Sequence, residues 1–155
     1  MATLIGEGHD LELWIAGDGE AREELERQAV ATGYGDRLRL LGFQADTAAL
    51  FENFDLFCLS SLREGLPNVV LEAMAMEVPV LATRCGGIEA FARDGTDMLT
   101  VPAGSADALA EGLRRLIGDV ELRCRLAGAA RARIEAEFSF RLRMQRMAEV
   151  YELLW

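Results

Sequence analysis

The sequence predicts an α/β fold, in which a doubly wound parallel sheet has helices on both faces and is followed by C-terminal helices. Two observations predict it. Short apolar runs alternate with stretches of helical periodicity, and parallel strands need crossover connections of this kind. Four of the five apolar runs also lead directly into loops that contain glycine, as in sheets whose strands all end at one edge.

Five short apolar runs are predicted to be strands. The first ends at Gly17 and the second at Gly42, whereas the last is stopped by Pro102, which cannot donate a hydrogen bond to a neighbouring strand. The predicted strands are Leu11 to Ala16, Leu38 to Leu41, Asp55 to Leu59, Val78 to Ala82 and Met98 to Val101.

Helical periodicity fills the segments between and after the strands. In the first of them, Leu25, Ala29 and Val30 are apolar and charged residues stand between them. Beyond Pro102 the pattern is helical throughout. The predicted helices are Glu20 to Thr32, Thr47 to Phe54, Val69 to Met76, a short helix that ends at Arg93, Ala106 to Ile117, Val120 to Phe138 and Phe140 to Leu154.

The composition is that of one globular domain covering residues 1–155. Hydrophobic residues make up 51% of the chain, too many for a disordered segment. The net charge of −10 argues against a nucleic-acid partner, because phosphate contacts need a basic face. We expect no transmembrane segment, since no apolar stretch reaches about 18 residues. Residues 1–10 show no signal peptide.

Cysteine and histidine are too few and too scattered for a metal site, and none is expected. Cys58, Cys85 and Cys124 are widely spaced, and His9 is the only histidine. Reduced, mostly buried thiols are typical of a cytoplasmic protein. All sixteen basic residues are arginine, so any mechanism that needs a lysine of this chain is excluded.

Glycine-containing loops are predicted at the carboxyl ends of the strands, where ligands of doubly wound sheets bind. Their clustering at one edge predicts a ligand cleft without reference to any family. The loops are Gly17-Asp18-Gly19, Gly42-Phe43-Gln44, Ser60 to Gly65 and Cys85-Gly86-Gly87.

The most informative segment is the run from Ser61 to Ala75, which places one carboxylate before a helix and another inside it. Pro67 suits the first helical position, where its missing N–H would be unpaired anyway. Glu72 is the only polar residue from Val69 to Met76, so we expect a buried helix. A buried carboxylate needs hydrogen-bond donors, and ligand hydroxyls at the start of the helix would supply them.

This run resembles the glutamate–seven residues–glutamate signature of the nucleotide-sugar-dependent glycosyltransferases of the GT-B fold, family 4. The resemblance implies that Glu64, the catalytic candidate, contacts the transferred sugar, and that Glu72 binds the ribose hydroxyls. Gly65, Leu66, Pro67 and Asn68 complete the matching string and are the other donor-binding candidates there. The alternative is an acidic helix start with a helix glutamate that pairs with Arg63 or Arg84.

The other loops carry further donor-binding candidates, each with an alternative. Gly17 and Gly19 could present backbone N–H groups to a phosphate, or Asp18 could simply be a helix N-cap. The resemblance places Gly42, Phe43 and Gln44 against the nucleotide base, although Phe43 could equally be a core residue. Gly86 and Gly87 resemble the family's glycine pair.

The sequence departs from the family pattern in three places. Ala90 stands where a glutamate is common, with Glu89 one position early. Glu77 stands where a glycine often precedes the next strand, and Met98 stands where glycine is common. The resemblance extends from about Leu11 to Leu154 and implies a Rossmann-like domain, the C-terminal, donor-binding half of a GT-B enzyme. The N-terminal acceptor domain and the first strand of this domain are expected to be missing.

The expected function is therefore transfer of a sugar from a nucleotide donor to an acceptor such as a glycan or lipid-linked saccharide, with retention implied by the resemblance. No cofactor is expected besides the nucleotide-sugar substrate, and the isolated chain should be largely inactive. An exposed sheet edge could support a homo-oligomer. Two alternatives stay open. One is a non-catalytic nucleotide-binding or interaction domain; the other is a dinucleotide-dependent oxidoreductase, disfavoured because Arg22 replaces the third glycine of its fingerprint.

Overall fold

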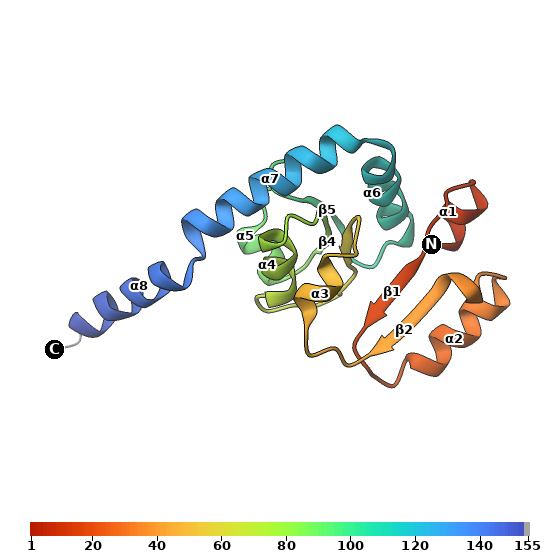
Figure 1. The fold of residues 1–155 in the computed structure, drawn as a ribbon, viewed down its shortest axis with the longest axis horizontal. Helices are drawn as coiled ribbons and strands as arrows, with labels where there is room; N and C mark the ends of the chain where they lie inside the picture. Colours follow the sequence, from red (N-terminus) through yellow and green to blue (C-terminus); the bar gives the residue numbers. More distant parts are fainter. Residues whose placement is uncertain (154–155) are drawn as a thin grey trace. The chain divides into compact units, whose positions relative to one another are not determined.

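The structure of the chain, a computed structural model, describes residues 1–153 (Figure 1). Its contacts divide the chain into two compact units, Met1–Thr47 and the residues from Ala48 onward, and each unit is described by itself. In both units the strands are parallel and helices connect them. The predicted α/β class is thereby confirmed, while a single domain over the whole chain stays a prediction.

The first unit contains two parallel strands joined by a helix. Leu13 of β1 (Leu13–Ala16) lies opposite Leu38 of β2 (Leu38–Gly42). The connection consists of α2 (Arg22–Ala31) and a 3-10 turn, Gly35–Arg37. A short helix, α1 (Ala2–Gly6), precedes β1 and buries Leu4 completely. It was not predicted, because five residues are too few to show helical periodicity.

The second unit contains a three-stranded parallel sheet in the order β3-β4-β5, with Leu81 of β4 opposite both Cys58 of β3 and Leu99 of β5. Helices precede, connect and follow the strands. The elements in chain order are α3 (Thr47–Phe51), β3 (Phe57–Leu59), α4 (Asn68–Ala75), β4 (Val80–Arg84), α5 (Gly87–Phe91), β5 (Leu99–Pro102), α6 (Ala106–Gly118), α7 (Val120–Glu137) and α8 (Phe140–Glu152).

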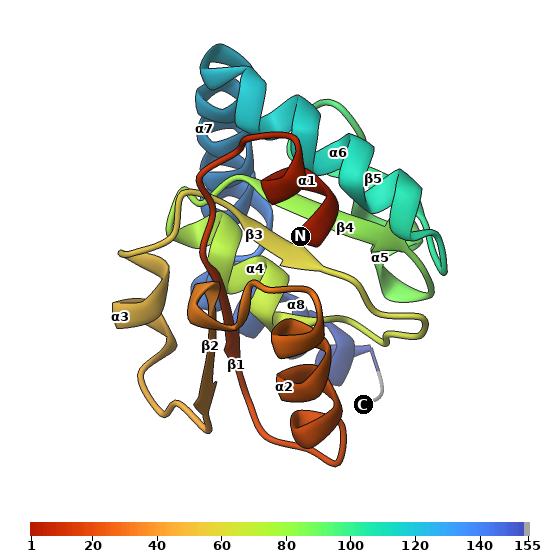
Figure 2. The same ribbon diagram turned by 90° about the vertical axis from the view of Figure 1, so that its right-hand side faces the viewer.

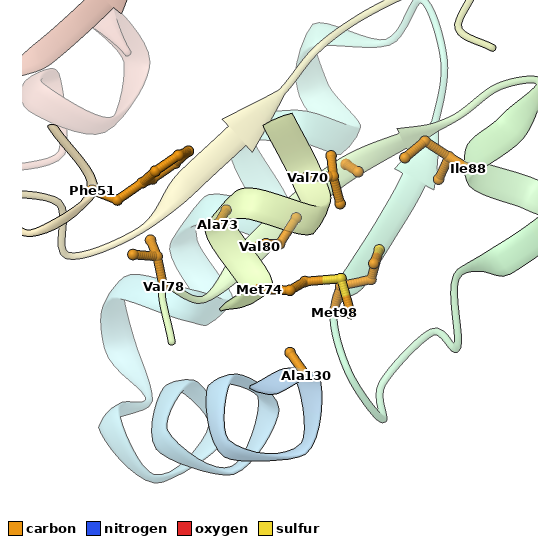
Figure 3. Close-up of a cluster of buried hydrophobic side chains, with 10 residues drawn as sticks. Phe51, Val70, Ala73, Met74, Val78, Val80, Ile88, Met98 and Ala130 are labelled. Atoms are coloured by element: carbon orange, nitrogen blue, oxygen red, sulfur yellow. The ribbon is translucent and has the colours of Figure 1, made fainter. Parts of the chain in front are cut away.

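The central strand β4 separates two apolar clusters, because successive side chains of a strand point to opposite faces. Val80 and Ala82 pack with Val70 and Met74 of α4 in one cluster, drawn in Figure 3. Leu81 packs in the other cluster with leucines of β5, α6 and α7. Figure 2 shows α4 and α6 on opposite sides of these strands. Helices therefore cover both faces of this sheet, as a parallel sheet requires.

The three C-terminal helices begin at side chains that cap them. Ser105 Oγ accepts from the Ala108 N–H at 3.1 Å, Asp119 Oδ1 from the Leu122 N–H at 2.8 Å, and Ser139 Oγ from the Leu142 N–H at 3.4 Å. Each cap satisfies one backbone donor that the first helical turn leaves open. The helices start at the predicted residues, Ala106, Val120 and Phe140, and the predictions of these three starts are therefore confirmed.

Elsewhere the predicted boundaries are shifted by a few residues. The fourth strand starts at Val80 rather than Val78. Helix α4 starts at Asn68, and Pro67 is its N-cap, with φ −75° and ψ 100°. The prediction that Pro67 occupies the first helical position is therefore wrong by one residue. Residue 154, the predicted end of the last helix, lies outside the described residues.

Candidate functional site

The glutamate loop, residues 60–66, connects β3 to α4 and contains Glu64. Glu64 is half-buried, and its Oε1 accepts a hydrogen bond from Ser61 Oγ at 2.6 Å. This short bond to an ionised acceptor fixes the carboxylate relative to the start of the loop. The loop follows the carboxyl end of β3, at the edge of the sheet where ligands of parallel sheets bind.

The glycine turn, Cys85-Gly86-Gly87, follows the next strand and lies directly against the glutamate loop. The Gly87 N–H donates to the Glu64 carbonyl oxygen at 3.1 Å. A Cβ on Gly86 would stand 2.0 Å from that carbonyl oxygen, and a Cβ on Gly87 would stand 1.4 Å from the Gly65 carbonyl oxygen. The structure thus brings together two of the loops that the sequence predicts to form the cleft.

A buried hydroxyl joins β4 to the same loop. Thr83 is completely buried, and its Oγ1 donates to the Ser61 carbonyl oxygen at 2.5 Å. Sequence reasoning missed Thr83, and it placed Ser61 in the glutamate loop without giving its side chain a role. The available signal was a single hydroxyl at the end of the apolar run Val80 to Ala82, because a buried hydroxyl needs a partner.

Helix α4 places Glu72 differently from the prediction. The helix buries Val70, Ala73 and Met74, whereas Glu72 is exposed. The expectation of a buried carboxylate inside an all-apolar helix is therefore wrong. Eight residues of helix make only two turns, and one side of them stays open to solvent.

The other candidates around the start of α4 differ in their exposure to solvent. Pro67 is buried, while Gly65, Leu66 and Asn68 are exposed. Leu66 keeps 53% of its surface accessible. The exposed apolar surface of Leu66 can contact apolar parts of a ligand, and the Glu64 carboxylate near it can accept hydrogen bonds from ligand hydroxyls.

In the first unit the structure brings Gly17 and Gly42 together. The Gly17 N–H donates to the Gly42 carbonyl oxygen at 2.7 Å. Both residues adopt positive φ, 116° and 67°, a region that glycine enters without steric cost. The turn therefore requires glycine at these two positions whether or not a ligand binds.

The hydrogen bonds and exposure of Asp18 and Phe43 decide between the alternatives that the sequence left open. Helix α2 begins at Arg22, and the Asp18 carboxylate accepts from the Gly19 N–H at 3.0 Å. The N-cap interpretation of Asp18 is therefore wrong. Phe43 is 81% exposed, which contradicts the core interpretation of that ring. Gln44 donates from its side chain to the Leu41 carbonyl oxygen at 2.8 Å.

Two arginines flank the second-unit loops. Arg63 precedes Glu64, and Arg84 ends β4 just before the glycine turn; both are exposed. Within residues 1–153 neither of them forms an ion pair. The alternative in which these arginines only neutralise a glutamate is therefore not observed.

The thiols are partly as predicted. Cys85 is buried, but Cys58 is half-buried and Cys124 is exposed. Burial raises the pKa of the Cys58 thiol to about 11, which makes it a poor nucleophile at neutral pH.

Two shallow hollows lie away from the predicted loops. One, of about 180 Å³, lies between α2 and β2, and the other, of about 220 Å³, lies beside β5 and α6. In the part of the chain that the structure describes, no three potential metal ligands are grouped. Among the described helices, none combines the length and the apolar character needed to cross a membrane.

Comparison with known proteins identifies a family that this chain matches. The family model of group 1 glycosyl transferases matches residues 1–119. A lipopolysaccharide core biosynthesis glycosyltransferase of Rhizobium meliloti is 39% identical over 127 residues, 82% of this chain and 37% of that protein. The alpha-D-kanosaminyltransferase of Streptomyces kanamyceticus is 34% identical over 97% of this chain and 39% of that protein.

Solved structures agree in fold. The crystal structure of Anabaena HepE in complex with UDP matches 92% of this chain over 41% of its own, with a TM-score of 0.87 and 26% identity. The C-terminal domain of a group 1 family protein of Francisella tularensis matches 77% of this chain over 63% of its own, with a TM-score of 0.71 and 26% identity. The chain thus spans about two fifths of the length of the two curated relatives.

Proposed function

The chain belongs to the group 1 glycosyl transferases, and we propose that it is the part of such an enzyme that binds the nucleotide-sugar donor. One observation carries the proposal. The Glu64 carboxylate is held at the carboxyl edge of a parallel sheet by a 2.6 Å bond from Ser61, in a loop that touches the glycine turn. Support comes from HepE, which has been crystallised with UDP and with UDP-glucose.

In this proposal the two glutamates contact different parts of the donor. Glu64, as the catalytic residue, accepts hydrogen bonds from the transferred sugar, and Glu72 accepts from the ribose hydroxyls. The exposed position of Glu72 is compatible with this role, because a surface carboxylate can bind a ligand without a prior cost of burial. Gly65, Leu66, Pro67 and Asn68 form the surface between them.

The other candidates contact the nucleotide. We assign the diphosphate to the backbone N–H groups of Gly17 and Gly19. We assign the base to the loop Gly42-Phe43-Gln44, mostly through its backbone. The reaction breaks the bond between the anomeric carbon and the phosphate oxygen and forms one to an acceptor oxygen, so negative charge develops on the leaving diphosphate. Positive charge stabilises that leaving group. Arg63 in the glutamate loop and Arg84 at the end of β4 are exposed cations next to these loops.

The proposal also covers the longer enzyme to which this chain corresponds in part. Because the chain spans 37% and 39% of the two relatives above, we assign the acceptor to a further part of the longer enzyme. Transfer with retention and association of copies through a sheet edge belong to the same proposal. We also place the enzyme in the cytoplasm, free or peripheral to the membrane.

Calorimetric titration of the protein with UDP, UDP-glucose and NAD tests the donor-binding proposal. We expect the two uridine nucleotides to bind and the dinucleotide not to bind. NAD binding alone would overturn the proposal in favour of an oxidoreductase. A protein that binds UDP equally well with and without the sugar would instead be a nucleotide-binding module without a sugar site.

A further inference from the structure

We propose that Ser61, Thr83, Gly86 and Gly87 are positioning residues for Glu64, and that the two glycines act by leaving room for the glutamate loop. The inference rests on the proposed function, because that function gives the Glu64 carboxylate a sugar to contact. It gives a role to the Thr83 and Ser61 hydroxyls, to which the sequence analysis gave none. It also changes the role of the glycine pair from contact with the ligand to support of the loop.

The backbone of the glutamate loop occupies the space in which side chains at residues 86 and 87 would lie. Real Cβ atoms essentially never approach another heavy atom within 3.0 Å, yet a Cβ on Gly87 would stand 1.4 Å from the Gly65 carbonyl oxygen. The obstacle is backbone, which cannot rotate away as a side chain can. Even alanine at residue 87 would therefore displace the loop by roughly 1.5 Å.

The displacement would move Glu64 itself. The Gly87 N–H donates to the Glu64 carbonyl oxygen at 3.1 Å, and a Cβ on Gly86 would stand 2.0 Å from that same oxygen. The glycine turn thus touches the loop at the residue that carries the carboxylate. A misplacement of about 1 Å at a reacting centre can cost a hundredfold in rate, so the contact has functional consequences.

Hydroxyl groups fix the other end of the loop and the carboxylate. Thr83 is anchored inside β4 and completely buried, and it holds the Ser61 carbonyl oxygen at 2.5 Å. Ser61 Oγ in turn holds Glu64 Oε1 at 2.6 Å. Two hydrogen bonds, one to the backbone of Ser61 and one from its side chain, therefore connect the buried strand to the carboxylate. They hold both the loop and the Glu64 side chain in place.

The first experiment changes one glycine at a time. Crystal structures of Gly87→Ala and of the control Gly128→Ala would be compared with the unchanged protein. Gly128 lies in α7 with nothing within 4 Å of its Cβ position. We expect Gly87→Ala to move Glu64 and Gly128→Ala to leave it in place. Glu64 at its original position in Gly87→Ala would overturn the inference.

The second experiment needs no steric clash, so it stays informative if Gly87→Ala does not fold. Ser61→Ala removes the donor to Glu64, Ser61→Thr restores a hydroxyl, and Ser60→Ala is the control at an exposed neighbour. We expect Ser61→Ala to weaken UDP-glucose binding about tenfold and UDP binding by less than about twofold. Ser61→Thr should recover most of the loss.

The outcomes separate this inference from the proposed function. An unchanged protein that binds neither nucleotide would overturn the proposed function, whereas the position of Glu64 in the variant crystals tests the positioning separately. If UDP-glucose binds and Ser61→Ala neither moves Glu64 nor weakens that binding, the positioning role is wrong. Equal weakening of UDP and UDP-glucose in Gly87→Ala, with Glu64 in place, would return the glycine pair to direct ligand contact.

Discussion

Arg133 of α7 forms a buried ion pair with Asp97, in the segment that precedes β5. The Asp97 side chain is 1% exposed and that of Arg133 is 9% exposed. Asp97 also accepts from the Arg93 N–H at 3.0 Å. The Arg133 guanidinium lies 5.8 and 5.4 Å from the ring centroids of Phe91 and Phe138, so this pair connects α5, β5 and α7 through both charge and aromatic contact.

Arg133→Ala should destabilise the second unit strongly, because it leaves the Asp97 carboxylate buried without its cation. We expect a loss of about 3–5 kcal/mol in the free energy of unfolding. Arg27→Ala is the control, since Arg27 and its partner Glu24 lie on the surface with 73% and 48% of their side chains exposed, and there the loss should stay below about 1 kcal/mol. Urea unfolding followed by circular dichroism measures both; similar losses would contradict the prediction.

Glu137 should contribute an acid-dependent part of the stability. Hydrogen bonds from Arg133 and Arg93 lower the pKa of Glu137 below its ordinary value of 4.5. A group with a lowered folded-state pKa stabilises the fold above its unfolded pKa and loses that contribution as the pH falls through the folded-state value. Glu137→Gln should therefore flatten the dependence of the urea midpoint on pH below 4.5. An equally steep dependence in the variant would count against it.

Glu77→Gly should stabilise the protein. Glu77 follows α4 with φ 55° and is the one residue other than glycine with positive φ among residues 1–153. The left-handed conformation costs a side-chain-bearing residue roughly 1–2 kcal/mol, and glycine avoids that cost. Glycine loses more entropy on folding, so we expect a net gain of about 1 kcal/mol.

The matched control for Glu77 is alanine. Glu77→Ala removes the carboxylate but keeps the Cβ, so its melting temperature should not rise. Differential scanning calorimetry compares the two variants with the unchanged protein. A gain in Glu77→Ala equal to that in Glu77→Gly would show that charge, and not backbone conformation, limits stability here.

The two glutamates of the motif should respond differently to neutralisation. Glu72→Gln should weaken UDP and UDP-glucose alike, since both carry the ribose, whereas Glu64→Gln should weaken only UDP-glucose. Each lost bond to a charged acceptor costs roughly 1.5–3 kcal/mol, or about ten- to a hundredfold in affinity. Glu89→Gln, on the exposed side of α5, is the control in the same titrations. Parallel losses for both ligands in Glu64→Gln would refute this division.

Much of the fold followed from periodicity alone, and the exceptions are short or marginal elements. Runs such as Val120 to Phe138 are long enough for the apolar spacing and the Asp119 cap to agree with each other. Helix α1 has five residues and shows no period. The strands start at Leu13, Phe57, Val80 and Leu99, each one or two residues later than predicted. The apolar residues Leu11, Leu56 and Val78 precede three of these starts, and apolar character alone does not separate a strand from the loop that enters it.

For the site, the sequence by itself determined which loops stand at the carboxyl ends of the strands and which carboxylates they carry, because glycine, proline and glutamate show in the local pattern. Tertiary structure alone decided that Glu72 is exposed, that Thr83 and Ser61 support Glu64, and that the glycine turn needs its glycines for the neighbouring loop. The contacts of Thr83 and of the glycine turn with the glutamate loop join residues more than twenty positions apart, and such contacts leave no periodic trace in the chain.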